Sequence, residues 1–408
     1  MTGSANPDPF ALTASNRALL TVALSPDAEK AAAAWRAWRA ATDLDALPAG
    51  QYLMLPALYA NLARFGLADE ADPRIKGVYR RAWYANRRLV ELAAAALTAL
   101  GGAGIPAALG GAAAVQELYA GPGERPIGQS ELLVAPADVT SAAATLVGAG
   151  WRPVRALDLL ADPGYRQWAH QAMFRRDRAE VQRLADVELL SLAWRPLPAA
   201  PAPGDAARFG ALALDTGAAP PRLRREAQLI LACARAVEGS PSRLIALADA
   251  CVILRTPLDW GLVVDLAGLL AAARPLAAVL PAVEEVLGVG RLEVAATVAK
   301  SAYADSPDGQ PAQAGFAEVA AVSNRRGEDQ GELPHERLDD ARGRAGRVRF
   351  HLRRWRRIAR GQGAALTPLS LLRYLQAAAG VARLRQLPRR LWQAAIRRKN
   401  ANHHRANR

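Results

Sequence analysis

The sequence predicts an α+β fold that is predominantly helical, in which a small mixed sheet is flanked by N-terminal and C-terminal helical bundles. Of the 408 residues, 51% are apolar but only 6% are aromatic, and alanine is the commonest residue, so the core is expected to form mostly by packing of helix on helix. Helical spacing dominates both flanks. Only the middle of the chain, over 101–195, combines short apolar runs with glycine turns.

The region 1–100 is predicted to be helical. Apolar residues recur at three- and four-residue spacing from residue 27 onward, and Pro48, Pro56 and Pro73 divide this pattern into short helices. The last helix is expected over 75–100, because the glycine pair that follows it suits a helix C-cap.

The region 101–195 is predicted to be a small α/β unit. An apolar run over 107–109 leads into Gly110-Gly111 and then into an alanine-rich stretch over 112–119, which predicts a strand, a glycine turn and a helix. Further strands are expected over 127–134, 151–154 and 181–190, with a helix between the first two.

Four segments follow. We expect a Pro/Ala-rich connection over 196–221, a helical domain over 222–300, a partly disordered linker over 301–346 and a basic helical tail over 347–408. The net charge of the chain is +14, yet the last 68 residues contain 18 Arg, one Lys and no acidic residue. The positive charge is therefore concentrated at the C-terminus, and the first 340 residues carry a net charge of −5.

The two cysteines lie in apolar helical runs and cannot form a disulfide framework. No apolar stretch is long and uninterrupted enough for a membrane span, and the N-terminus lacks the cationic start of a signal peptide. These features predict a cytoplasmic protein.

Several groups of residues occur in an order that resembles the uncharacterised nucleotidyltransferase family of the polymerase-β-like superfamily. They are Leu55-Pro-Ala-Leu-Tyr-Ala-Asn-Leu62, Gly104-Ile-Pro-Ala-Ala-Leu-Gly-Gly111, Arg125-Pro-Ile-Gly-Gln-Ser-Glu-Leu-Leu-Val134 and Arg243-Leu-Ile-Ala-Leu-Ala-Asp249. The likeness spans roughly residues 15–290.

The resemblance implies a nucleotide site. In nucleotidyl transfer, two metal ions held by carboxylates brace the attacking and leaving oxygens of the phosphate. The family places Asp-x-Asp where this chain has Gln129-Ser130-Glu131, and a further acidic residue on a later strand, for which Glu188 is the nearest match. Glu131 and Glu188 are therefore the expected catalytic and metal-binding residues. The residues expected to bind the nucleotide are Gly110, Gly111, Arg125 and Gln129.

Three departures from the family pattern predict impaired catalysis. Gln129 is neutral where a carboxylate would bind a metal, Gly110 replaces the only nearby cation that would meet a phosphate, and Leu190 replaces a histidine. A nucleoside triphosphate is thus the expected ligand, and binding of Mg²⁺ is expected to be weak or absent.

Each candidate also has a purely structural interpretation. Gly110-Gly111 suits a strand-to-helix turn, Glu131 a solvated strand carboxylate, and Arg125 an exposed loop position. Glu188 would pair with an arginine, and Arg175 and Arg183 are the candidates by sequence.

Three functions remain open at this stage. The chain is an active nucleotidyltransferase, a degenerate relative that binds a nucleotide or a protein partner without turnover, or a scaffold whose tail over 347–408 contacts an anionic membrane or nucleic acid. The family resemblance implies a sugar, lipid-linked or peptide acceptor. For the tail, the alternative is that Leu352 and Trp355 pack on the protein itself. Deletion of 341–408 is expected to leave a folded core.

Overall fold

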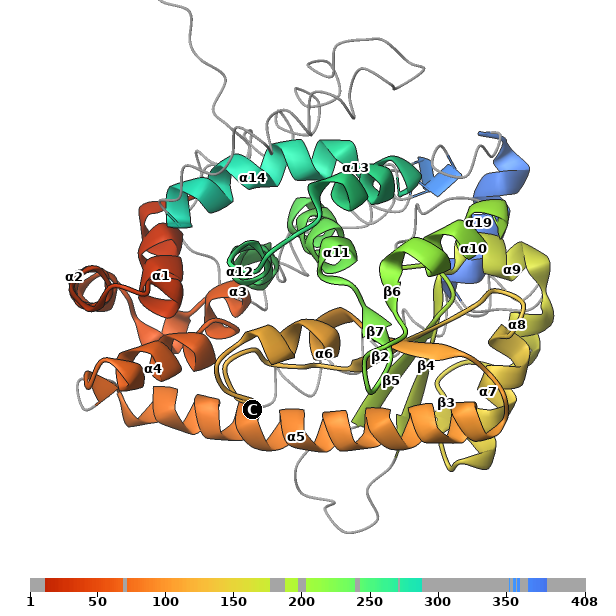
Figure 1. Cartoon of the computed structure of the whole chain (residues 1–408), viewed down its shortest axis with the longest axis horizontal. Coiled ribbons are helices and arrows are strands. Elements are labelled where there is room, and N and C mark those ends of the chain that lie inside the picture. The colour runs from red at the N-terminus through yellow and green to blue at the C-terminus, as the bar shows by residue number, and fades with distance from the viewer. Residues whose placement is uncertain are drawn as a thin grey trace, which may run out of the picture.

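A computed structural model describes the chain over residues 12–68, 72–176, 188–196, 203–238, 243–270, 272–287 and 366–379, together with Leu352, Trp355, Arg356, Ile358 and Ala359. Within these residues the protein is mostly helical and contains one seven-stranded mixed sheet (Figure 1). The predicted α+β class is therefore confirmed.

The N-terminal helices begin where the sequence supplies capping side chains. Thr13, Asp27 and Asp72 each accept hydrogen bonds from backbone N–H groups in the first turn of the helix that follows. The helices are α1 (Ala14–Leu24), α2 (Ala28–Ala40), α3 (Ala49–Tyr52), α4 (Leu55–Arg64) and the 30-residue α5 (Pro73–Gly102).

The sheet has the strand order β3-β4-β5-β2-β1-β7-β6. Its strands are β1 (Ala107–Gly110), β2 (Ser130–Val134), β3 (Arg152–Pro153), β4 (Gln171–Arg176), β5 (Glu188–Ala193), β6 (Leu214–Asp215) and β7 (Arg222–Leu223). At its centre, β2 pairs antiparallel with β1 and parallel with β5. The remaining helices are α6 (Gly111–Val115), α7 (Val139–Gly148), α8 (Asp158–Ala161), α9 (Pro163–Trp168), α10 (Pro203–Ala213), α11 (Arg225–Glu238), α12 (Arg243–Leu254), α13 (Trp260–Leu269), α14 (Ala273–Leu287) and α19 (Pro368–Ala379).

Alternation of side chains along the strands gives the sheet two faces with different partners. One face, which we call the α5 face, carries Leu132 and Leu190 and packs on a core that includes Leu92 of α5. The other, the α11 face, carries Leu133 and packs on a core that includes Ile230 of α11. Figure 1 shows α5 running along one side of the sheet and α11 to α14 stacked on the other.

Helices that precede the sheet in the sequence share the core of the α11 face with helices that follow it. Leu20 and Leu58 from the N-terminal helices are fully buried together with Leu247 and Val279 from α12 and α14. The helices α11, α12, α13 and α14 lie within the segment 222–300 that was predicted to be helical, of which 288–300 is outside the described residues.

The middle of the chain holds more structure than the sequence predicts. The segment expected to be a Pro/Ala-rich connection contains α10 and the short β6, and β4 has no counterpart among the predicted strands. The predicted strand over 181–190 corresponds to β5, which continues to Ala193, while 181–187 lies outside the described residues.

The described residues of the basic tail pack on the protein itself. Trp355 and Ile358 are buried in the core beneath the α5 face, and Leu352 packs against that core. Tyr374 of α19 is also buried, with its ring 6.1 Å from that of Trp168 in an edge-on arrangement. Deletion of 341–408 would uncover apolar side chains of this core, and the expectation that the rest of the chain stays folded remains a prediction. The predicted linker over 301–346 lies outside the described residues.

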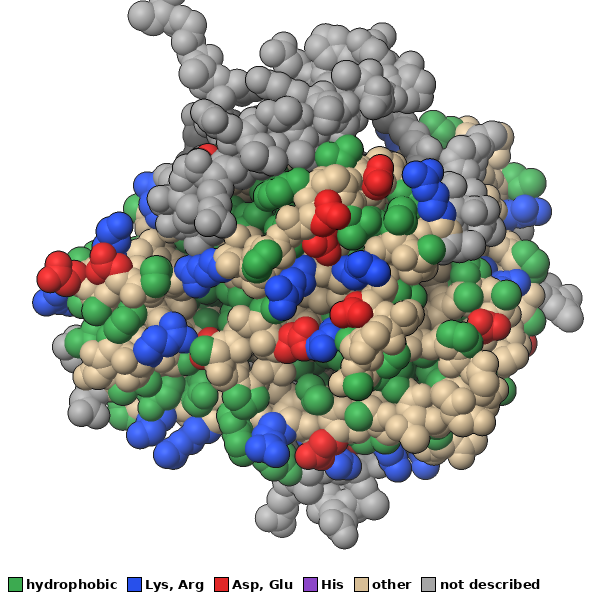
Figure 2. Space-filling view, viewed as in Figure 1, with side chains coloured by type: hydrophobic (Ala, Val, Ile, Leu, Met, Phe, Trp, Pro, Cys, Tyr) green, Lys and Arg blue, Asp and Glu red, His purple; other side chains and the backbone are tan. Residues whose placement is uncertain are grey.

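Exposed cations lie along α5. Figure 2 shows Lys and Arg side chains gathered on the edge of the molecule that this helix forms, and the exposed ones are Arg74, Lys76, Arg80, Arg81 and Arg87. Across the residues that the structure describes, no helix is both long and apolar enough to span a membrane.

We predict that Trp355→Ala lowers the free energy of unfolding by about 3–5 kcal/mol, because it removes a large buried ring and leaves a cavity in the core. The matched control is Leu372→Ala, since Leu372 is 43% exposed on α19 and should lose less than about 0.5 kcal/mol. Denaturant unfolding of the full chain measures both. Equal and small losses would show that Trp355 is not part of the core.

Candidate functional site

The turn between β1 and α6 is built from two glycines for steric reasons. Gly111 has φ of +58°, in the left-handed region that other residues rarely adopt. A Cβ atom on Gly110 would lie 2.9 Å from Oε1 of Glu131 and 3.0 Å from Cδ1 of Leu133. Any side chain at Gly110 would therefore displace Glu131.

Glu131 lies directly over this turn. It is paired in register with Gly110, and its side chain is also within 3.3 Å of the position that a Cβ on Gly111 would take. The residue is only 8% exposed. Its Oε2 lies 3.5 Å from Nη2 of Arg235, which reaches the site from α11, whereas its Oε1 is buried and has no hydrogen-bond partner among the described residues.

Burying a carboxylate oxygen without a hydrogen-bond partner costs free energy, because the oxygen loses its hydrogen bonds to water and gains none in return. In Glu131 this oxygen points at the glycine turn, where the backbone leaves space for no side chain. Among the described residues, this oxygen therefore has acceptor capacity that no protein donor uses.

The neighbouring position on β5 is occupied by Ser191. Its Cα is the register partner of Glu131, so both side chains lie on the α11 face. The Ser191 hydroxyl donates to Oε1 of Gln171 at 2.7 Å. Gln129, which precedes β2 by one residue, is half-buried, and alternation along the chain would place it on the same face as Glu131.

Glu188 lies on the opposite face. It shares the α5 face with Ser130, whose hydroxyl donates to the backbone carbonyl of Leu89 on α5. Glu188 is 7% exposed, and its Oε1 accepts a hydrogen bond of 2.9 Å from Nε of Arg88 on the same helix. The structure therefore does not bring Glu188 to Glu131.

The structural alternative for Glu188 was an ion pair with an arginine, and the structure contains such a pair with Arg88. Arg175 carries its side chain on the other face of the sheet, and Arg183 lies outside the described residues. Among the residues that the structure describes, no three His, Cys, Asp or Glu side chains are grouped so that they could hold a metal ion together.

Arg125 takes part in a buried network that connects the loop before β2 to α12. Its Nη2 and Nε donate to the two carboxylate oxygens of Asp249 at 2.7 and 3.1 Å, and the Tyr119 hydroxyl donates to Asp249 at 2.9 Å. Burial raises the pKa of Tyr119 well above its ordinary value, so the hydroxyl keeps its proton. The same loop is held to α5 by Asn86, which donates to the carbonyls of Pro122 and Arg125.

Arg125 is thus buried rather than exposed, and so is Asp249, the carboxylate with which it pairs. The structure gives Arg125 a structural role in positioning β2, and its contact with a nucleotide stays a prediction.

Two residues of the site were missed by reasoning from the sequence. Arg235 supplies a cation beside Glu131, so the expectation that Gly110 leaves no cation near the turn is wrong. Ser191, and not Glu188, is the β5 residue next to Glu131. Arg235 is 104 residues from Glu131 in the sequence, and no local pattern marks either residue.

We predict that Asp249→Ala lowers the free energy of unfolding by about 3–5 kcal/mol, because it leaves the charge of Arg125 buried and unpaired. The matched control is Asp45→Ala, which removes the partner of Arg74 in an exposed ion pair and should cost less than about 1 kcal/mol. Denaturant unfolding compares the two variants. A loss for Asp249→Ala as small as that for the control would contradict a structural role for the buried pair.

The comparisons with known proteins identify one family. The family model described as "Uncharacterised nucleotidyltransferase" matches residues 49–288, which include the whole sheet and the helices from α3 to α14. No curated protein and no solved structure matches the chain. Since the matched region is more than half of the sequence and contains the glycine turn, Glu131 and Arg235, the chain belongs to the uncharacterised nucleotidyltransferase family.

Proposed function

We propose that this protein binds a nucleoside triphosphate, accompanied by Mg²⁺, beside Gly110, Gly111 and Glu131, and that it transfers the nucleotide slowly or not at all. Family membership supports a nucleotidyltransferase-like function in general. The observation that carries the proposal is that Glu131, with one unpaired buried oxygen, has Ser191 rather than a second carboxylate next to it.

The donor set fits a magnesium ion only in part. Magnesium commonly binds to proteins through one or two carboxylates together with the phosphates of the nucleotide that it accompanies. The Oε1 of Glu131 is a suitable single ligand, because it is an acceptor without a partner. Two ions that brace the attacking and leaving oxygens need shared carboxylates, and Gln129 and Ser191 are neutral.

Arg235 supports the nucleotide-binding part of the proposal. Its side chain is 26% exposed, and its Nη2 lies 3.5 Å from Oε2 of Glu131, so the guanidinium retains donors for a further anion. Arginine forms paired hydrogen bonds with phosphate oxygens. When bound, the metal ion would neutralise phosphate charge next to Glu131, and Arg235 would orient the same phosphates.

Glu188 and Arg125 have a smaller part in this proposal. Each is already held by a protein partner, so we propose that they stabilise the walls around the site rather than bind the nucleotide.

The nature of the acceptor, whether a sugar, a lipid-linked molecule or a peptide, stays a prediction from the family resemblance. The alternative function, a scaffold that contacts an anionic partner through 347–408, also stays a prediction, and the buried Trp355 and Ile358 are unavailable for it.

The proposal is tested by calorimetry of the full chain with a non-hydrolysable nucleoside triphosphate, with and without Mg²⁺. We expect saturable binding that Mg²⁺ strengthens, and loss of this strengthening in Glu131→Gln, because the variant lacks the charge that meets the ion. Arg235→Gln should weaken binding about tenfold or more with and without the ion, as expected for a lost charged hydrogen bond.

Glu188→Gln is the matched control, since it removes the same charge from the other face of the sheet and should leave nucleotide affinity unchanged. Thermal unfolding of each variant verifies that it is folded. Absence of nucleotide binding would contradict the proposal. So would rapid release of pyrophosphate from a nucleoside triphosphate that disappears in Glu131→Gln, because the protein would then be an active enzyme.

A further inference from the structure

A cavity of about 480 Å³ lies at the end of the sheet where β1 begins and where β2 and β5 end. Ligand sites in proteins commonly enclose roughly 300–1,000 Å³. Gly110 and Glu131 lie at the other end of the same strands and do not line it. The cavity is therefore distinct from the proposed nucleotide site, although Leu133, which lines it, also lies next to Gly110.

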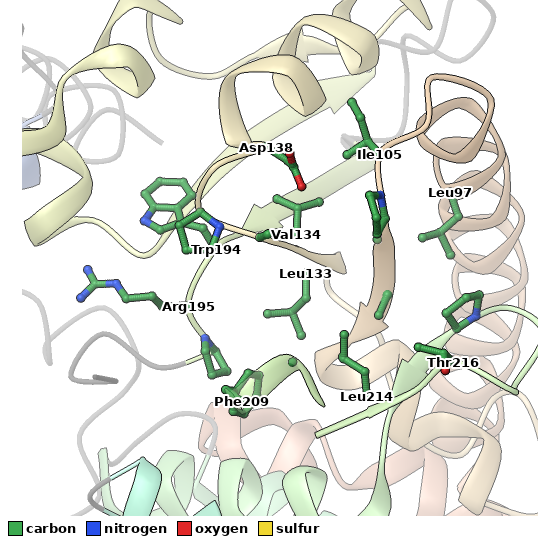
Figure 3. Close-up of a pocket in the computed structure, with 18 of the residues that line it drawn as sticks. Leu97, Ile105, Leu133, Val134, Asp138, Trp194, Arg195, Phe209, Leu214 and Thr216 are labelled. Atoms are coloured by element: carbon green, nitrogen blue, oxygen red, sulfur yellow. The ribbon is translucent and has the colours of Figure 1, made fainter. Parts of the chain in front are cut away.

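The walls of the cavity are largely apolar and come from elements far apart in the sequence. Figure 3 shows Leu97 from α5, Ile105 before β1, Val134 at the end of β2, and Phe209 and Leu214 from α10 and β6 around one space. Walls of this kind suit the apolar body of a small molecule.

The polar groups at the cavity have unequal roles. Arg195 contributes its apolar stem to the wall, while its guanidinium points away and donates to the backbone carbonyls of Arg166, Gln167 and Ala169. Asp138 is different. It occupies the N-cap position of α7, yet its side chain makes no capping hydrogen bond, and Figure 3 shows the carboxyl group turned toward the apolar side chains.

A carboxylate only accepts hydrogen bonds, and at the edge of an apolar space it favours a cationic donor. We propose that this cavity binds a cationic amphiphile, a small molecule that places an apolar body against Leu133, Val134 and Phe209 and a protonated amine at Asp138. This inference does not depend on nucleotide binding.

The test uses three probes with the same ten-carbon chain and different head groups, namely decylamine, 1-decanol and decanoate. Calorimetry with the full chain, below the micelle-forming concentrations of decylamine and decanoate and below the solubility limit of 1-decanol, should show saturable binding of decylamine at least tenfold tighter than that of decanoate. Asp138→Asn should remove this preference and retain binding of 1-decanol, since only the charge is lost.

A second variant tests the position of the site. A Cβ on Gly210, a helical glycine that lines the cavity, would meet no atom within 4 Å, so Gly210→Leu should fill the space without disturbing α10 and abolish binding of all three probes. Gly148→Leu is the matched control, because Gly148 is also a helical glycine with open space around it but lies at the far end of α7.

Circular dichroism verifies that both glycine variants remain folded. The proposal is overturned if no probe binds saturably, if decanoate binds as tightly as decylamine, or if the folded Gly210→Leu variant binds decylamine as well as Gly148→Leu does.

Discussion

The pairing register of β1, β2 and β5 determines which polar side chains can meet in this protein. Because side chains alternate along a strand and register partners share a face, Gly110, Glu131 and Ser191 lie side by side on the α11 face. Glu188 lies on the α5 face for the same reason. A shift of one residue in β5 would move Glu188 to the α11 face and Ser191 to the α5 face, so this register decides whether Glu188 shares a face with Glu131.

The glycine turn and Glu131 depend on each other. The carboxyl group of Glu131 occupies the space directly over Gly110, and a lysine there, which the family resemblance implies, would collide with it. A side chain at Gly110 would therefore require the carboxyl group of Glu131 to move from its present position. The cation that a lysine would have supplied comes instead from Arg235, on a helix that the buried pair of Arg125 and Asp249 helps to anchor through its neighbour α12.

The sequence was sufficient for features that depend on local chemistry. The glycine pair at the end of α5 and the glycines of the β1–α6 turn mark the ends of elements, and these ends were predicted close to where they lie. The strand β4 and the two-residue β6 and β7 were missed, because their stability comes from pairing with distant strands and their sequences show little alternation.

The site was predictable only in part for the same reason. Gly110, Gly111 and Glu131 follow from the order of motifs, and the structure brings them together. Choosing between Glu188 and Ser191 requires the pairing register, and finding Arg235 requires the packing of α11 on the sheet, neither of which a single sequence contains. The buried Trp355 confirms the alternative in which Leu352 and Trp355 pack on the protein itself, although the sequence did not show which part of the core they join.

Electron paramagnetic resonance can count the Mn²⁺ ions that the protein binds together with a non-hydrolysable nucleoside triphosphate. This number tests most directly whether Glu131 is the one carboxylate of the site. If Glu131 is the one carboxylate of the site, the unaltered chain binds a single weak ion, and the double variant Gln129→Asp, Ser191→Asp binds two. A site with Glu131 as its one carboxylate is contradicted if the Gln129→Asp variant binds a second ion and the double variant Gln129→Asp, Glu188→Gln does not. Glu188 would then belong to the site.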